Sequence, residues 1–226
     1  QMCIRNRLVG NSYPYYNNMP AMFDSIAHTQ KKPVAITTIV KGGERFSGHL
    51  KNPRLIELLK KGGWNFVVLQ EQSTDPAMPT QEVAAGTYKN AHTLDSLAKA
   101  GSPDVKVIFY MTWGHKYGSR IKKEGYPLID TYEGMQKRLA TSYLEMAYDN
   151  NSICAPVGLA WEQIRKNHPE YVLYRPDAYH PSALGSYLIA NVLYTTIFPK
   201  PYQTAYTAGF SPEMAEIIQQ LSLIHI

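Results

Sequence analysis

The chain has 226 residues, of which 44% are hydrophobic and 18% are charged, so it can bury a core and is neither a disordered tail nor a coiled coil. Its net charge of +5 reflects 23 basic and 18 acidic residues. The basic residues are scattered or in doublets such as Lys31-Lys32, which indicates solvated faces and no nucleic-acid partner. No apolar run approaches the roughly 20 residues of a membrane-spanning helix.

Strands and helices are predicted to alternate along the chain. In chain order they are a strand at residues 4–9, a helix at 19–29, a strand at 34–40, a helix at 53–61, a strand at 66–69, a helix at 80–100, a strand at 105–111, a helix at 132–149, a strand at 153–157 and helices at 159–166 and 184–197. β-branched and continuous apolar runs indicate the strands, whereas helical spacing of apolar residues indicates the helices. This order predicts a three-layer α/β/α sandwich, with a flavodoxin-like parallel sheet of about five strands and helices on both faces.

The ends of the chain and its cysteines give further expectations. Cys3 and Cys154 form neither a disulfide framework nor a metal-site spacing. The chain opens on Gln1 and contains no signal peptide, and an upstream segment would suit a secreted or periplasmic protein. Residues 221–226 match the translation of a transposase sequencing adapter, so we expect one domain over residues 1–220, followed by an adapter-derived tail in which His225 has no function. The oligomeric state stays open.

A serine and a histidine lie where such sheets place their chemistry, outside the carboxyl ends of the strands. Ser12 follows the first strand, and a serine hydroxyl becomes a good nucleophile only when a base, oriented by an acid, takes its proton. Among the seven histidines, His180 follows Asp177 by three residues, so the carboxylate can turn back within one loop to hold Nδ1–H. Gly-Asn-Ser alone is a common turn, and Asp or Ser often caps a helix. Their joint occurrence at opposite ends of the chain favours a catalytic triad.

Three segments carry a family resemblance: VGNSYPYYNNMP, VVLQEQS and DAYHPSALGSYLIA. Over residues 8–190 the chain resembles the SGNH branch of the GDSL-like esterases and lipases, in particular an uncharacterised branch with GNS, LQEQS and DxxHPS blocks. The resemblance implies a serine hydrolase that cleaves carboxylic esters through an acyl-serine, with Ser12, Asp177 and His180 as its triad and without cofactor or metal. The implied substrates are small-molecule or glycan esters, with O-acetyl carbohydrates and short acyl esters of other alcohols as the two candidates.

The same resemblance implies an oxyanion hole. In this family its donors are the N–H of the nucleophile, a glycine N–H after the second strand and an Asn side chain after the third. Ser12 supplies the first, and Gly43 or Gly42 occupies the glycine position. No Asn follows the third strand, but Gln72, or alternatively Gln70, has the same amide donor on a longer stem. If neither glutamine reaches, we expect a slow enzyme or an inactive carbohydrate-binding domain on the same fold.

Residues after the first and fourth strands are candidates for substrate contact: Asn11, Tyr13, Trp113 and His115. Each also has a structural interpretation, since Trp is often part of the core and His115 could be an exposed loop residue. Glu71 is expected to accept hydrogen bonds from local donors. The sequence contains no G-x-G-x-x-G and no P-loop, which argues against nucleotide binding, and its His and carboxylate residues do not cluster as metal ligands.

Overall fold

The computed structural model describes residues 4–200 and 202–223. Its centre is a five-stranded sheet in the order β2-β1-β3-β4-β5, in which every neighbouring pair is parallel. The strands are β1 (Ile4–Gly10), β2 (Val34–Val40), β3 (Phe66–Leu69), β4 (Lys106–Tyr110) and β5 (Ile153–Ala155). This order is the flavodoxin-like one, and its direction of winding reverses between β1 and β3. The predicted parallel α/β sheet is confirmed.

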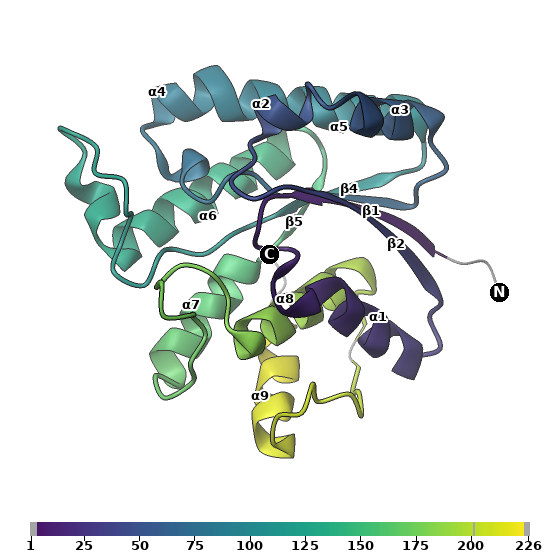
Figure 1. The fold of residues 1–226 in the computed structure, drawn as a ribbon, viewed down its shortest axis with the longest axis vertical. Coiled ribbons are helices and arrows are strands. Elements are labelled where there is room, and N and C mark those ends of the chain that lie inside the picture. The colour runs from purple at the N-terminus through teal and green to yellow at the C-terminus, as the bar shows by residue number, and fades with distance from the viewer. Residues whose placement is uncertain (1–3, 201, 224–226) are drawn as a thin grey trace.

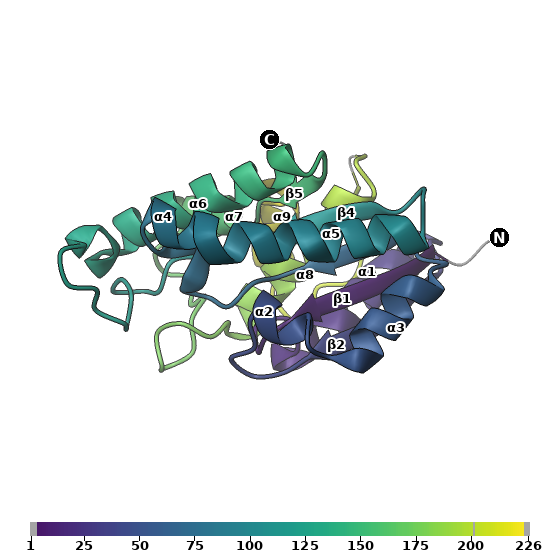
Figure 2. The ribbon, with the colours of Figure 1, turned by 90° about the horizontal axis from the view of Figure 1, so that it is seen from above.

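Helices cover both faces of the sheet, which lies between them in Figure 1. One layer contains α2 (Phe46–His49), α3 (Pro53–Lys61), α4 (Thr80–Val83), α5 (Lys89–Gly101) and α6 (Tyr132–Asp149). The other contains α1 (Met19–Thr29), α7 (Val157–Asn167), α8 (Ala183–Ile197) and α9 (Pro212–Leu221). Figure 2 shows the first layer from above, with α3, α5 and α6 lying over the sheet and running roughly along its strands. The three-layer sandwich is therefore also confirmed.

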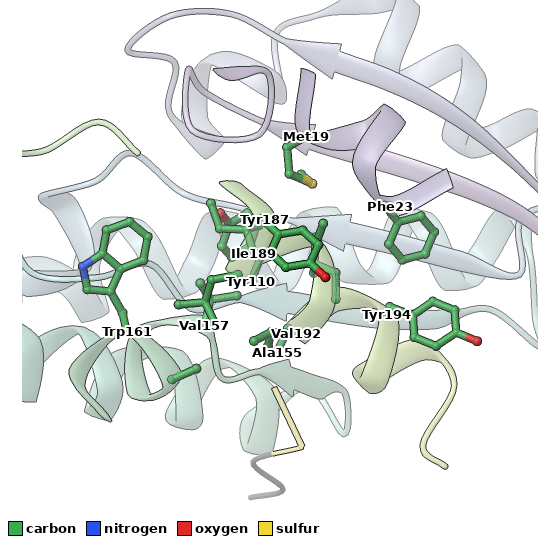
Figure 3. Packing of buried hydrophobic residues seen from close by; sticks show 14 of the residues in the cluster. Met19, Phe23, Tyr110, Ala155, Val157, Trp161, Tyr187, Ile189, Val192 and Tyr194 are labelled. Carbon is green, nitrogen blue, oxygen red and sulfur yellow. The ribbon is translucent and has the colours of Figure 1, made fainter. Parts of the chain in front are cut away.

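β3 is apolar throughout, and β4 is apolar after Lys106, because both faces of these strands are buried. Successive side chains of a strand point to opposite faces. Val68 and Tyr110 therefore pack with α1, α7 and α8, whereas Val67 and Phe109 pack under α3, α5 and α6. Figure 3 shows the first of these cores, where residues of α1, α7 and α8 meet residues of β4 and β5. Burial on both faces explains why these strands are continuous apolar runs in the sequence.

Local signals fix several helix boundaries. The Asn52 Oδ1 accepts hydrogen bonds from the N–H groups of Arg54 and Leu55, Pro53 occupies the first turn of α3, and Gly62 follows its end with φ of 68°. The Ser182 hydroxyl accepts a hydrogen bond from the Gly185 N–H at 3.0 Å, which caps α8. Capping satisfies N–H groups that have no partner within the helix. Because Ser182 comes two residues after His180, this cap fixes where the His180 loop joins α8.

The structure divides one predicted helix, shortens one predicted strand and adds two helices. The predicted helix at 80–100 is divided into α4, a π-helical segment (Ala84–Tyr88) and α5. The predicted strand at 153–157 ends at Ala155, since Pro156 has no N–H for the ladder and α7 begins directly after it. The sequence analysis missed the short α2 and the C-terminal α9, whose Ala215 and Ile218 are buried.

The predictions about the chain ends concern residues that the structure describes only in part. Cys3 and His225 lie outside them. Ser222 is buried, and its carbonyl accepts a hydrogen bond from the Thr195 hydroxyl of α8 at 2.6 Å. The adapter origin of residues 221–226 stays a prediction. No helix in the described part of the chain has both the length and the apolarity needed to cross a bilayer.

Candidate active site

The turn after β1 is held in place by side chains from neighbouring elements. The Gln70 Oε1, which follows β3, accepts a hydrogen bond from the Asn11 N–H at 2.9 Å, and the His49 Nε2 lies 3.0 Å from the Gly10 carbonyl oxygen. A Cβ at Gly10 would lie 2.6 Å from that Gln70 oxygen, so only glycine leaves it room. These contacts position Ser12 at the carboxyl edge of the sheet, between β1 and β3, where the winding reverses.

Ser12, His180 and Asp177 form one hydrogen-bonded chain. The Ser12 Oγ lies 2.8 Å from the His180 Nε2, and the His180 Nδ1 lies 2.8 Å from the Asp177 Oδ2. An ionised carboxylate can only accept, so Nδ1 carries the proton and Nε2 is left to accept from the hydroxyl. The structure thus brings together the three residues predicted as a triad, although Ser12 and His180 are 168 positions apart.

Hydrogen bonds within the loop favour the ionised form of Asp177. Its Oδ1 accepts from the N–H groups of Tyr179 at 3.1 Å and of His180 at 2.9 Å. Partial burial opposes ionisation, but the bonds from His180 and Tyr179 outweigh it, so the pKa of Asp177 lies below its usual value. The His180 ring packs between Tyr16 and Tyr179, whose centroids lie 4.3 and 4.1 Å away. The His180 imidazole is therefore positioned by the Asp177 carboxylate at Nδ1 and by the rings of Tyr16 and Tyr179.

Four candidate oxyanion donors lie at the same cavity as Ser12: the backbone N–H groups of Ser12, Gly42 and Gly43, and the Gln72 amide. In the described part of the chain, none of these three N–H groups donates a hydrogen bond. Gly43 has a φ of 68°, a backbone conformation that favours glycine. The Gln72 Oε1 accepts from the Thr74 N–H and hydroxyl, both at 2.7 Å, and from Asp75 N at 3.1 Å. That oxygen is fully occupied, and the Gln72 NH₂ donates no hydrogen bond to another described residue.

Gln70, the alternative donor, is not brought to the cavity. It is fully buried, its oxygen holds Asn11, and its Nε2 donates to the Glu71 carbonyl. Its role is to support the nucleophile turn. Glu71 accepts from the N–H groups of Phe46 at 2.8 Å and Gln72 at 2.7 Å, as expected of a partner for local donors. Burial raises the pKa of Glu71 to about 8.

The cavity at Ser12 has a volume of about 450 Å³. Its lining comes from the loops after β1, β2, β3 and β4 and from the loop before α8: Asn11, Ser12, Tyr13, Tyr15, Tyr16, Gly42, Gly43, Gln72, Ser73, Thr74, His115, Arg120, Ile121, Tyr179 and His180. Asn11, Tyr13 and His115, three of the predicted substrate contacts, line it. The contribution of all these loops follows from the parallel sheet, in which every strand ends at the same edge.

Trp113, the fourth predicted substrate contact, belongs to the core instead. It is fully buried and stacks between Tyr13 at 4.5 Å and Trp161 at 4.0 Å. Its indole N–H donates to the Tyr179 carbonyl at 3.1 Å. Trp113 therefore supports two residues of the cavity wall, Tyr13 and Tyr179, from behind.

His115 is buried rather than an exposed loop residue. Both of its ring nitrogens lack a hydrogen-bond partner within the described residues. Burial, followed by the nearby charge of Arg120 and the proximity of His180, lowers the pKa of His115 to about 4. At neutral pH it is an uncharged imidazole with one donor and one acceptor.

Sequence reasoning missed Arg120, Tyr179, Ser73, Thr74 and Ile121 as cavity residues. Tyr179 lies within the DAYH segment and Ser73 follows the third strand, so adjacency to identified blocks could have indicated both. Arg120 and Ile121 come from a long loop without apolar periodicity, and no signal in the sequence places that loop at the cavity. Among the described residues, no group of three or more His, Cys, Asp or Glu is arranged to hold a metal ion.

Comparisons with known proteins show which solved structures resemble this fold. No protein-family model and no curated protein matches the sequence. Among solved structures, a protein from Slackia heliotrinireducens assigned as an SGNH hydrolase has a TM-score of 0.66 and 28% identity, over 87% of this chain and 100% of that one. A DUF4886 family protein from Bacteroides uniformis has a TM-score of 0.77 and 14% identity, over 98% and 94% of the two chains.

A variant of an acetyl-xylooligosaccharide esterase from Geobacillus has a TM-score of 0.56 and 13% identity, over 89% of this chain and 97% of that one. Other similar structures include a GDSL-like lipase and a further esterase. The resemblance seen in the sequence thus extends to the whole three-layer architecture. The chain has the SGNH/GDSL-like hydrolase fold, and the structures that share it include those of hydrolases and esterases.

Proposed function

We propose that this protein is a serine hydrolase that cleaves carboxylic esters through an acyl-serine intermediate. The observation that carries the proposal is the hydrogen-bonded chain from Ser12 through His180 to Asp177, with both connecting distances at 2.8 Å. A serine, a neutral imidazole and a carboxylate in this order are the three parts needed to activate a hydroxyl. Ser12 and His180 line a cavity, which gives an ester access to the nucleophile and its base.

In the first half of the reaction, the Ser12 Oγ attacks the ester carbonyl carbon while the His180 Nε2 takes the hydroxyl proton. The tetrahedral intermediate collapses when the carbon–alkoxide bond breaks and His180 returns the proton to the leaving alcohol. In the second half, His180 takes a proton from water, the resulting hydroxide attacks the acyl-serine, and the proton returns to Ser12 as the acid leaves. Asp177 keeps its charge throughout and stabilises the imidazolium.

The negative oxygen of both intermediates needs donors. We assign this role to the N–H groups of Ser12 and of Gly43 or Gly42, together with the Gln72 amide. The free N–H groups at the cavity and the anchored Gln72 oxygen support the assignment. Donors that are already oriented stabilise the oxyanion without reorganisation during the reaction.

For the substrate, we propose acetyl esters of carbohydrates, with short acyl esters of other alcohols as the competing class. Tyrosine rings at the cavity support a carbohydrate, because their apolar faces and polar tips suit sugars. Tyr15 is 44% exposed and stacks on Tyr16 at 5.5 Å, so the pair offers such a surface beside the nucleophile. The shared fold with an acetyl-xylooligosaccharide esterase is consistent with this class.

The test combines covalent labelling with hydrolysis. A fluorophosphonate probe should label the parent protein at Ser12 and should not label Ser12→Ala. The parent should also hydrolyse p-nitrophenyl acetate and release acetate from acetylated glycans, and Ser12→Ala should fall to the background of the remaining histidines. Ser222→Ala is a matched control, since Ser222 is also buried but lies in the C-terminal segment. If the parent is not labelled and hydrolyses no ester, the protein is an inactive binding domain on this fold.

A further inference from the structure

The cavity at Ser12 has an unbalanced charge. Of the described residues that line it, Arg120 is the one with a permanent charge, and none is a carboxylate. Asp177 lies behind His180, with its oxygens engaged by His180 and Tyr179. A ligand in the cavity therefore meets a cation with no competing anion in the lining.

Arg120 has no counter-ion in the described part of the chain, whereas Lys122 and Lys123 of the same loop do. Lys122 pairs with Asp130 at 2.8 Å and Lys123 with Glu82 at 2.7 Å. No hydrogen bond or ion pair joins Arg120 to another described residue. Its guanidinium instead lies 4.4 Å from the centroid of the Tyr179 ring. Stacking on a ring holds the plane of the guanidinium but leaves its N–H donors unused.

The position of Arg120 is built into the fold. The loop between β4 and α6 is tied to the loop of the triad, because the Lys116 N–H donates to the Ala178 carbonyl at 2.8 Å. Closer to Arg120, the Ser119 N–H donates to the Ile129 carbonyl at 2.7 Å. These bonds keep the cation beside the Asp177–His180 loop.

His115, whose ring nitrogens also lack polar partners among the described residues, contacts the same Tyr179 ring. The His115 ring lies 5.3 Å from that of Tyr179 and lines the cavity, and both of its nitrogens are buried without a partner. A buried polar atom without a partner is costly, so a ligand that bonds to it relieves that cost. The guanidinium of Arg120 and the imidazole of His115 thus both lack polar partners at one wall of the cavity.

We propose that Arg120 and His115 form a subsite for an anionic group, so that the preferred ester carries a carboxylate or similar anion in addition to its scissile bond. The inference rests on the proposed ester hydrolysis and specifies its substrate class. An acetylated acidic sugar fits both proposals: its acetyl group meets Ser12 and its carboxylate meets Arg120. Bidentate N–H bonds from Arg to a carboxylate give such a site both affinity and orientation.

The test compares pairs of similar esters in which one member carries a carboxylate and the other is neutral. One pair is an O-acetylated uronic acid and its methyl ester, in which the anion is on the alcohol side. The other is mono-4-nitrophenyl succinate and 4-nitrophenyl butyrate, in which the anion is on the acyl side. The readout is the ratio of kcat/KM for the anionic ester to that for the neutral one. Arg120→Gln should lower this ratio by about 10- to 100-fold, as expected for a lost charge-assisted bond. Arg120→Lys should recover part of it, and salt should reduce the ratio for the parent.

Lys116→Gln is the matched control, because it removes the same charge from the same loop at a side chain outside the cavity lining; its ratio should equal that of the parent. A drop in the ratio for either substrate pair supports the subsite and identifies the side that carries the anion. The subsite is refuted if the parent hydrolyses the neutral esters and is labelled at Ser12, yet Arg120→Gln leaves both ratios unchanged. Failure of ester hydrolysis itself appears separately, as a parent no faster than Ser12→Ala.

Discussion

Replacing Gln72 by Glu isolates the contribution of one oxyanion donor. The three hydrogen bonds that anchor Gln72 all end on its Oε1, from the Thr74 N–H and hydroxyl and from Asp75 N. A glutamate keeps an oxygen in that place, so the loop after β3 should retain its shape. The NH₂ is replaced by an oxygen that carries negative charge at pH 7 to 8, because an ordinary Glu has a pKa near 4.3. The variant therefore loses a donor and gains repulsion toward the developing oxyanion.

Loss of one oxyanion donor lowers kcat by about 10²- to 10³-fold, or about 2.7–4 kcal/mol of transition-state stabilisation. For Gln72→Glu we expect the upper end, because of the added charge, with little change in KM or in the free energy of unfolding. The assay is steady-state hydrolysis of p-nitrophenyl acetate at pH 7.5, with urea unfolding as the stability control. Gln72→Ala should lose a similar factor in kcat but also destabilise the loop. A Gln72→Glu enzyme within threefold of the parent in kcat would remove Gln72 from the oxyanion hole.

Three further predictions follow from the same geometry. Asp177→Asn should reduce kcat/KM for p-nitrophenyl acetate by about 10²- to 10⁴-fold, because the amide no longer fixes Nδ1–H; activity within fivefold of the parent would contradict the triad. Glu71 binds its proton in the folded protein up to a pH of about 8, whereas its usual pKa is 4.5. Raising the pH from 5 to 8 should therefore lower the free energy of unfolding by up to about 1.4 kcal/mol per pH unit, and Glu71→Gln should flatten that slope in urea unfolding. Trp113→Ala should cost about 3–5 kcal/mol of stability in the same measurement, and a loss below 1 kcal/mol would show that this Trp is not core.

Much of the fold could be predicted because its determinants are local. Apart from β1, which contains Arg5, Asn6 and Arg7, the strands of the sheet are mainly apolar or β-branched runs. Pro53 and Gly62 mark the two ends of a helix that the structure contains. The pairing of Ser12 with His180 is not local, but catalytic chemistry links the two residues: a serine after the first strand needs a base, and a histidine with a nearby carboxylate can supply one. Chemistry therefore predicted a contact that periodicity could not.

The burial and the contacts of the loop residues could not be predicted from the sequence. His115 lies in a loop without periodicity, and its burial results from tertiary contacts. Its backbone N–H donates to the Met135 sulfur at 3.3 Å, and its ring packs on Tyr179. Gln70 and Gln72 are equally suitable donors by residue type. Only the structure distinguishes them, because Gln70 supports the Asn11 turn whereas Gln72 lines the cavity. Arg120 has no distinguishing pattern, because a cation in a polar loop is normally a solvated surface residue.

The hydrogen bond between Ser12 and His180 joins the turn after β1 to the loop that precedes α8. The helices that follow these two residues, α1 and α8, pack side by side in one layer (Figure 1). On the proposed mechanism, a nascent chain carries its nucleophile long before its base and gains activity only after the loop of His180 has been synthesised. A fragment cut anywhere between the two residues would then be inert unless its halves reassociate. The proposed ester hydrolysis would therefore report on assembly of the segments that carry Ser12 and His180, for which a local spectroscopic probe near either segment would be a poor substitute.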